Sequence, residues 1–161
     1  MLREGTAHSL SLPRELGCDS GLRVYVSSSI DTSSDYNERD VWVPTGLVRF
    51  VKNDDELAIA IAHQIAHRLV GSFHRLQDEP RIDSLALVLA ARAGFTITHA
   101  AGFWDRVAAE QPWKIPLATG GHPVDHGALE LRAPVIRASV AEIQNLIAAG
   151  KPITTATSAL R

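Results

Sequence analysis

The sequence has a single cysteine, no long apolar run and almost no net charge, and each of these absences excludes something. Cys18 cannot form a disulfide within the chain, and its place in a polar segment favours a bystander over a nucleophile. No apolar run, residues 57–62 included, approaches the length that crosses a bilayer. Residues 1–13 lack the apolar stretch of a secretory signal. A formal charge of -2 gives no electrostatic reason to expect nucleic acid or an anionic membrane as a partner.

What remains is the composition of an ordinary globular domain. With 161 residues, of which 45% are hydrophobic and 21% charged, the chain can form one domain with a sizeable core. We expect an irregular segment over residues 1–21, the folded domain over residues 22–152 and a loose tail over residues 153–161. We expect a cytoplasmic protein, or else a part of a longer parent that is exported or anchored to a membrane.

Hydrophobic periodicity and turn residues predict short strands followed by helices. Strands are expected at residues 22–26 and 41–43, with a polar loop over residues 27–38 between them. Helices are expected, in chain order, at residues 53–70, 80–94, 99–110 and 129–149, the last of them broken at Pro134. Residues 111–127 are rich in proline and glycine and are expected to form a long loop. The pattern predicts an α+β fold, mainly helical, with a small antiparallel or mixed sheet covering the first long helix.

The most clearly marked helix begins after Asn53. The Asn53 side chain can accept a hydrogen bond from a first-turn amide while Glu56 reaches back to Asn53, as in a capping box. The middle of this helix is apolar on every side, which predicts that it lies buried at the centre of the domain.

Two histidines interrupt this apolar helix. His63 and His67 are four residues apart and therefore share one helical face, from which two imidazoles can bind one zinc ion. Downstream, Glu79 can complete a His, His, Glu ligand set that leaves the fourth zinc position for water. Asp83, one turn further on, can accept the ring proton of a ligating histidine and fix its tautomer. We therefore predict a site for one zinc ion at His63, His67 and Glu79.

Each of these residues also has an ordinary structural interpretation. Core histidines can satisfy their hydrogen bonds without a metal, and the spacing His-x-x-x-His occurs by chance. Glu79 and Asp83 can be acids at a solvated helix start. The complete set favours the metal site, because two unpaired polar rings would be costly in a buried apolar helix.

Several motifs resemble one family of zinc metallopeptidases. Residues 45–58, T-G-L-V-R-F-V-K-N-D-D-E-L-A, and residues 62–67, A-H-Q-I-A-H, are similar to the core of the gluzincins that include HtpX and the prenyl-protein endopeptidases. Residues 79–83, E-P-R-I-D, match the E-x-x-A-D motif of that family. Further similar segments are A-G-F at residues 93–95, F-W-D-R-V-A at residues 103–108 and H-P at residues 122–123. The similarity covers roughly residues 22–152, and so the whole expected domain.

The resemblance implies a zincin-like, minigluzincin fold and a zinc-dependent hydrolase that cleaves peptides or unfolded proteins. In that family the glutamate of E-x-x-A-D is the third zinc ligand, which here is Glu79. The resemblance also implies that His122 and Arg132 stabilise the oxyanion formed when the peptide is attacked. The simpler interpretation of these two is a loop histidine and a surface arginine.

The sequence departs from the family at the position that matters most for turnover. Gln64 stands where the family has the glutamate that takes a proton from zinc-activated water, and an amide has no useful basicity. Loss of a general base typically slows catalysis about 100- to 10,000-fold. Zinc binding should survive, because Gln64 is not a ligand. Other departures are Ser33-Ser34 in place of an Asn-Ala pair and Ile82 in place of the alanine in E-x-x-A-D. Natural loss of activity and a deliberate isosteric substitution both explain Gln64.

The sequence thus leaves three functions open. The first is an HtpX-like zinc endopeptidase domain whose proteolysis is strongly impaired as written. The second is a pseudoenzyme that binds peptides or a protein partner, with or without metal, and the third is a helical domain with structural histidines. Strand residues 40–44 are a candidate sheet edge for an extended peptide, with simple packing as the alternative. Trp42, Trp104 and Trp113 are expected to pack in the core or the cleft.

Overall fold

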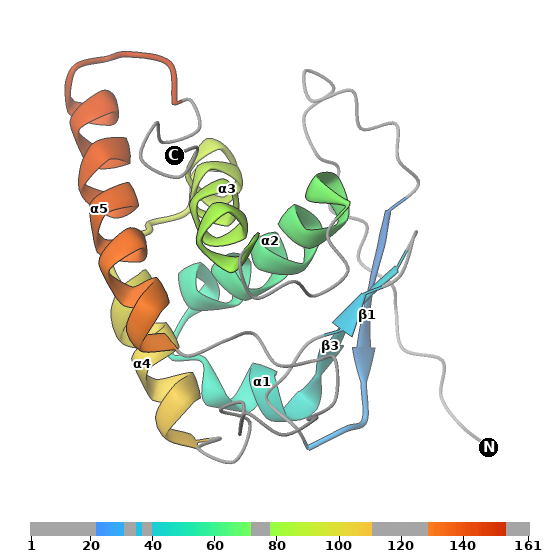
Figure 1. The fold of residues 1–161 in the computed structure, drawn as a ribbon. Coiled ribbons are helices and arrows are strands. Elements are labelled where there is room, and N and C mark those ends of the chain that lie inside the picture. The colour runs from blue at the N-terminus through green and yellow to red at the C-terminus, as the bar shows by residue number, and fades with distance from the viewer. Residues whose placement is uncertain (1–21, 31–34, 37–39, 72–77, 111–128, 154–161) are drawn as a thin grey trace.

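The structure is a computed structural model that describes residues 22–30, 35–36, 40–71, 78–110 and 129–153. Its fold is α+β and mainly helical, as the sequence predicts (Figure 1). The elements in chain order are β1 (Arg23–Ser27), β2 (Asp35–Tyr36), β3 (Asp40–Pro44), α1 (Thr45–Phe50), α2 (Asp54–Val70), α3 (Glu79–Arg92), α4 (Ala100–Glu110) and α5 (Leu129–Ala148). All four predicted helices are present, with ends within two residues of those expected.

The strand β3 is the central strand of a three-stranded mixed sheet of order β1-β3-β2. β1 runs parallel to β3 over its full length, starting from the pair Arg23 and Asp40. β2 runs antiparallel and pairs with Val41 and Trp42 of β3. The expectation that β3 is a sheet edge open to a peptide was therefore wrong, because a strand lies on each of its sides. The loop expected over residues 27–38 also missed β2, which is too short to show an alternating pattern.

The short helix α1 was not predicted. Its N-cap is Pro44 and its second residue is Gly46, and both residue types are more typical of a turn than of a helix. The Thr45 hydroxyl and the Gly46 backbone amide both donate hydrogen bonds to the carbonyl oxygen of Ser29, at 2.8 and 3.0 Å. These bonds tie the start of α1 to the segment after β1, so the turn after β3 continues as a helix.

The N-terminus of α2 is capped as predicted on one side only. The Asn53 side chain accepts a hydrogen bond from the Glu56 backbone amide at 3.0 Å. The Glu56 carboxylate does not return to Asn53 as a capping box requires; Oε2 accepts from the Lys52 backbone amide at 2.7 Å and from Arg106 at 2.6 Å. Gly71, with a φ of 65°, ends α2 in the left-handed conformation that glycine adopts without strain.

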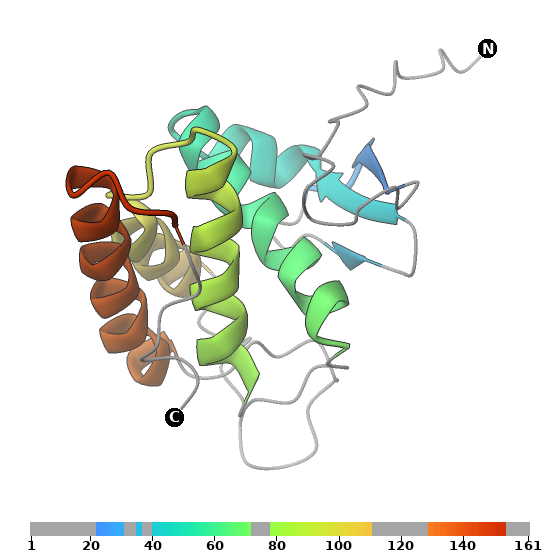
Figure 2. The same ribbon diagram turned by 90° about the horizontal axis from the view of Figure 1, so that it is seen from above.

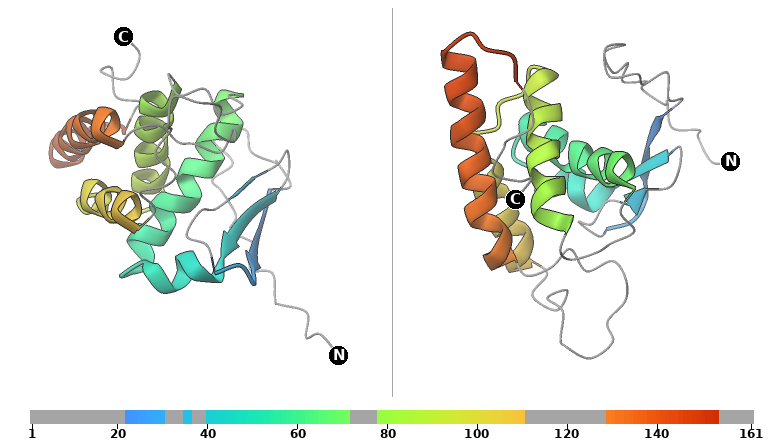
Figure 3. Two further views of the ribbon diagram at one scale, coloured as in Figure 1. Left: turned by 60° about the horizontal axis from the view of Figure 1, so that its bottom comes forward. Right: turned by 45° about the horizontal axis from the view of Figure 1, so that its top comes forward.

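The helix α2 occupies the centre of the fold, as its apolar middle predicts. β2 and β3 contact it on one side and α3 on another, and α5 packs on α3 and α4. Figures 2 and 3 show the resulting sequence of layers, from the sheet through α2 and α3 to α5. α5 continues through Pro134 rather than breaking there. The proline lies near the start of the helix on an exposed face, where its missing N–H removes a single helical hydrogen bond.

The core is one cluster of buried side chains from β3 and from all five helices of the described residues. Ile59, Ile82, Leu87 and Ile136 are fully buried there, and each such side chain contributes about 1.5–3 kcal/mol by leaving water. No helix in the described ranges is long and apolar enough to span a membrane. Residues 1–21 and 154–161 lie outside the described residues, and the carbonyl of Ile153 accepts a hydrogen bond from Arg92.

Candidate metal centre

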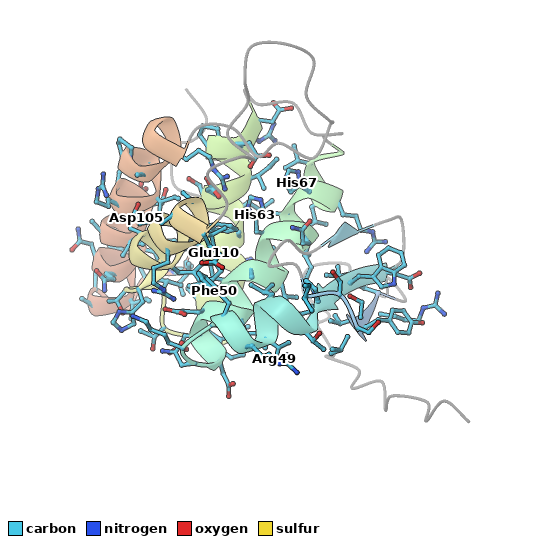
Figure 4. The ribbon with its side chains drawn as sticks, turned by 90° about the horizontal axis from the view of Figure 1, so that it is seen from below. Arg49, Phe50, His63, His67, Asp105 and Glu110 are labelled. Atoms are coloured by element: carbon cyan, nitrogen blue, oxygen red, sulfur yellow. The ribbon has the colours of Figure 1, made fainter. Side chains whose placement is uncertain are left out.

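The two histidines of α2 lie side by side inside the protein. Helical geometry places His63 and His67 on one face one turn apart, and both side chains are 0% exposed. Their Nε2 atoms are 3.1 Å apart, and the ring planes are nearly perpendicular at 87°. Figure 4 shows both labelled side chains on the same stretch of α2. The two nitrogen atoms therefore lie close enough to contact one common ion.

Glu79 brings a carboxylate to the same position from the first turn of α3. Oε1 lies 3.3 Å from Nε2 of His67, Oε2 lies 3.6 Å from Nε2 of His63, and the residue is 1% exposed. One donor atom from each of the three side chains can be chosen so that all lie within 4.8 Å of one another. The connection of eleven residues between His67 and Glu79 thus delivers the carboxylate that the sequence predicted.

The distances between these donor atoms fit a single ion. Atoms bound to one zinc ion at about 2.0–2.1 Å and at tetrahedral angles lie about 3.3 Å apart. The two histidine Nε2 atoms, 3.1 Å apart, and Oε1 of Glu79, 3.3 Å from Nε2 of His67, lie close to that separation. The 3.6 Å contact of His63 is made to the other carboxylate oxygen, Oε2. Two imidazole nitrogens and one carboxylate are also a donor set that zinc accepts. The residues present therefore fit the metal that the sequence motifs imply.

Asp83 stands behind His63, one turn along α3 from Glu79. Its Oδ1 lies 3.2 Å from Nδ1 of His63, on the side of the ring away from Glu79. A carboxylate at that nitrogen favours the tautomer with the proton on Nδ1 and leaves Nε2 with its lone pair for a metal.

Arg132, from α5, closes the site behind the two carboxylates. It donates two hydrogen bonds to Asp83, from Nε at 2.7 Å and from one terminal nitrogen at 2.6 Å. The other terminal nitrogen lies 3.5 Å from Oε2 of Glu79. Arg132 is only 3% exposed, so the interpretation as a surface arginine was wrong. The surface expectation failed because the charge is matched inside by two buried acids, which sequence spacing does not reveal.

The buried arginine controls the charge of Asp83. Burial alone opposes ionisation of Asp83, but the positive charge and hydrogen bonds of Arg132, aided by His63, outweigh it and hold the pKa of Asp83 well below its usual range. Burial likewise opposes the charge on Arg132, but Asp83 and Glu79 outweigh it and raise the pKa of the guanidinium. The pair therefore stays ionised at neutral pH.

Trp104 of α4 also contacts the site. Its ring lies 5.0 Å from the His63 ring, tilted by 60°, and the Arg132 guanidinium carbon lies 5.1 Å from its ring centroid. From sequence, Trp104 was expected to pack in the core or the cleft and was not connected with a metal ligand. The sequence feature that could have linked Trp104 to the site is its position in the F-W-D-R segment, which resembles the zinc metallopeptidase family.

The structure describes two of the remaining residues singled out from the sequence, Gln64 and Ile82. Gln64 is buried, 3% exposed, next to His63 on α2. Ile82 is fully buried in the core on α3, in place of the family's alanine. His122, Ser33-Ser34 and Trp113 lie outside the described residues.

No protein-family model matches this chain, and no curated protein matches it.

Proposed function

We propose that this chain is a zinc-binding domain of the metallopeptidase type, with peptides or unfolded proteins as its substrate class and with Gln64 suppressing turnover. One observation carries the proposal. The side chains of His63, His67 and Glu79 meet in a buried place, with one donor atom from each within 4.8 Å of the others and the two histidine Nε2 atoms 3.1 Å apart, which suits one tetrahedral ion. The α+β arrangement, with a small sheet over the helix that bears both histidines, is consistent with the zincin-like fold implied by the motifs.

The ligand roles follow from which atoms face one another. His63 and His67 would bind through Nε2, and Glu79 would bind through its carboxylate. Zinc held there would act as a Lewis acid, polarising a peptide carbonyl and lowering the pKa of water. Asp83 would hold the His63 ring by its Nδ1 side, and Arg132 would hold Asp83. The side-chain nitrogens of Arg132 contact the carboxylates of Asp83 and Glu79. Arg132 therefore fits a positioning role better than direct contact with substrate.

Gln64 sets the expected level of activity. It follows His63 directly on α2 and is buried. A glutamine has nearly the size of a glutamate, but one of the two acceptor oxygens is replaced by a donor NH2 group. An amide cannot accept and release a proton at neutral pH, so the chain lacks a general base at this position. Turnover should therefore fall about 100- to 10,000-fold below that of a chain with glutamate.

The same residue supports a second candidate function. A non-catalytic pseudo-peptidase would keep the buried ligand set and bind a peptide or a protein partner without cleaving it. Measurable hydrolysis by the unaltered chain, abolished by a chelator, would rule this candidate out in favour of a weak peptidase.

Metal analysis tests the shared basis of both candidates. We expect the purified chain, incubated with excess zinc and desalted, to carry one equivalent of zinc. His63→Ala should carry almost none. His99→Ala removes an exposed histidine just before α4 and should match the unaltered chain. If the unaltered chain binds no zinc, the metal site is refuted and the histidines are core residues.

A further inference from the structure

Four side chains, one of which is His63, form a closed ring of contacts. His63 lies 3.2 Å from Asp83, which binds Arg132 through hydrogen bonds of 2.6 and 2.7 Å. The Arg132 guanidinium lies over the Trp104 ring at 5.1 Å, and that ring returns to His63 at 5.0 Å. These residues come from α2, α3, α5 and α4, so each of the four long helices contributes one member.

Trp104 is the only aromatic member of this ring apart from the histidine itself, and it touches two others at once. Its indole packs on the imidazole of His63 and carries the cation of Arg132 on its face. An aromatic face attracts a guanidinium, and the attraction grows when both groups are removed from water. Trp104 is 9% exposed and Arg132 is 3% exposed, so this condition is met.

A second set of contacts holds α4 against α2 and fixes the position of the indole. The Arg106 side chain, two residues after Trp104, binds the buried Glu56 carboxylate of α2 at 2.6 Å. Phe103 packs on Trp104 with ring centroids 4.9 Å apart, and Phe103 in turn contacts Phe50 of α1. The indole is thus flanked by Phe103, and the helix that carries it is held against α2 by the partly buried Arg106–Glu56 ion pair.

We infer that Trp104 is a positioning residue for the metal centre, which orients the His63 ring and holds Arg132 against Asp83. The 3.2 Å contact with Asp83 at Nδ1 alone leaves the imidazole able to swing about that point, whereas the Trp104 ring, 5.0 Å away and tilted by 60°, limits the swing. Loss of the indole would therefore misdirect Nε2 of His63 and loosen Arg132 from Asp83. This inference rests on the proposed zinc site, and it assigns to that site a residue from a fourth helix.

The test is the zinc affinity of three variants, measured by competition with a chromophoric chelator at a temperature where circular dichroism shows each to be folded. Trp104→Leu removes the ring and should weaken zinc binding about 10- to 100-fold, as loss of a supporting group typically does. Trp104→Phe keeps a ring and should restore the affinity to within about threefold of the unaltered chain. Trp42→Leu makes the same change in β3, outside the ring of contacts, and should leave the affinity unchanged.

A second measurement does not depend on the leucine variant being folded. Trp42→Phe with Trp113→Phe leaves Trp104 as the sole tryptophan of the chain. Saturation with cobalt should then quench the Trp104 emission, because the ion would be bound by His63, whose ring contacts Trp104. A third measurement, made on the folded leucine variants, is the visible absorption of the cobalt form, which should change in Trp104→Leu and not in Trp42→Leu.

The outcomes separate this inference from the proposed function. Zinc bound by the unaltered chain and by Trp104→Leu with equal affinity would overturn the positioning role and leave the zinc site intact. Bound cobalt that leaves the Trp104 emission unchanged would also overturn it. Failure of the unaltered chain to bind zinc would overturn the site and this inference together.

Discussion

Arg132 holds Asp83 with two hydrogen bonds of 2.6 and 2.7 Å, in the two-pronged geometry that matches a guanidinium to a carboxylate. Both residues are nearly inaccessible to water, and they join α5 to α3. Asp83 then contacts His63 of α2, so the pair lies between the core packing of the helices and the candidate metal ligands. Stability and metal binding should both respond when it is broken.

Asp83→Asn should lower the free energy of unfolding by about 3 kcal/mol, because it leaves the buried charge of Arg132 without its main partner. Urea unfolding in the presence of a chelator measures this without interference from metal. Asp105→Asn makes the same change at an exposed position on α4 and should alter stability by less than about 0.5 kcal/mol. Equal stability of the two variants would show that the Asp83–Arg132 pair contributes little.

The stability difference between the unaltered chain and Asp83→Asn should depend on pH. The pKa of Asp83 is lowered in the folded state, so its contribution is complete above the pKa of an unfolded aspartate, about 3.9. As the pH falls below that value the unfolded chain takes up the proton first, and the difference shrinks. It disappears once the pH passes below the lowered pKa of the folded state. Unfolding series at several acidic pH values would measure it, and a difference that grows on acidification would contradict the charge assignment.

Restoring the base should restore turnover. Gln64→Glu is expected to raise the rate of cleavage of an unfolded protein at least about 100-fold, since a carboxylate can accept and deliver the proton. A chelator should abolish the gained activity. Gln144→Glu, an exposed change on α5 that adds the same charge, serves as the control and should show no gain. A Gln64→Glu chain that binds zinc and stays inactive would favour the non-catalytic pseudo-peptidase.

Zinc should stabilise the folded chain. An ion that binds only the native state at about 100 times its dissociation constant adds about 2.7 kcal/mol, which raises the melting temperature by several degrees for a domain of this size. Differential scanning calorimetry with and without a chelator would measure the shift. His67→Ala should lose it, and His99→Ala should keep it. A shift of equal size in His67→Ala would mean that the stabilising ion binds elsewhere.

Asn53→Ala should destabilise the chain by about 1 kcal/mol, because the Glu56 backbone amide would lose its cap. Asn145→Ala, at an exposed position within α5, should be neutral or slightly stabilising because alanine has the higher helix propensity. Chemical denaturation compares the two. If Asn53→Ala proves neutral, the Glu56 bonds to Lys52 and Arg106 hold the helix start by themselves.

Local regularities made much of this fold predictable. The spacing of His63 and His67 determines that they share a helical face, since an α-helix repeats every 3.6 residues. The Asn53 cap marked the start of α2 for the same local reason, and Glu79 to Asp83 placed two acids one turn apart on the next helix. The short elements α1 and β2 escaped prediction, because two to six residues carry too little periodic signal.

The sequence by itself determined the residue types of the candidate ligands, their helical spacing and the glutamine at position 64. Only the tertiary structure decided that β3 is central, that Arg132 is buried against Asp83, and that Trp104 lies on His63. The physical reason is the range of the forces concerned. Helical spacing and capping arise from hydrogen bonds between residues a few positions apart. The burial of a charge depends on which faces of distant helices pack together, and no short stretch of sequence specifies that.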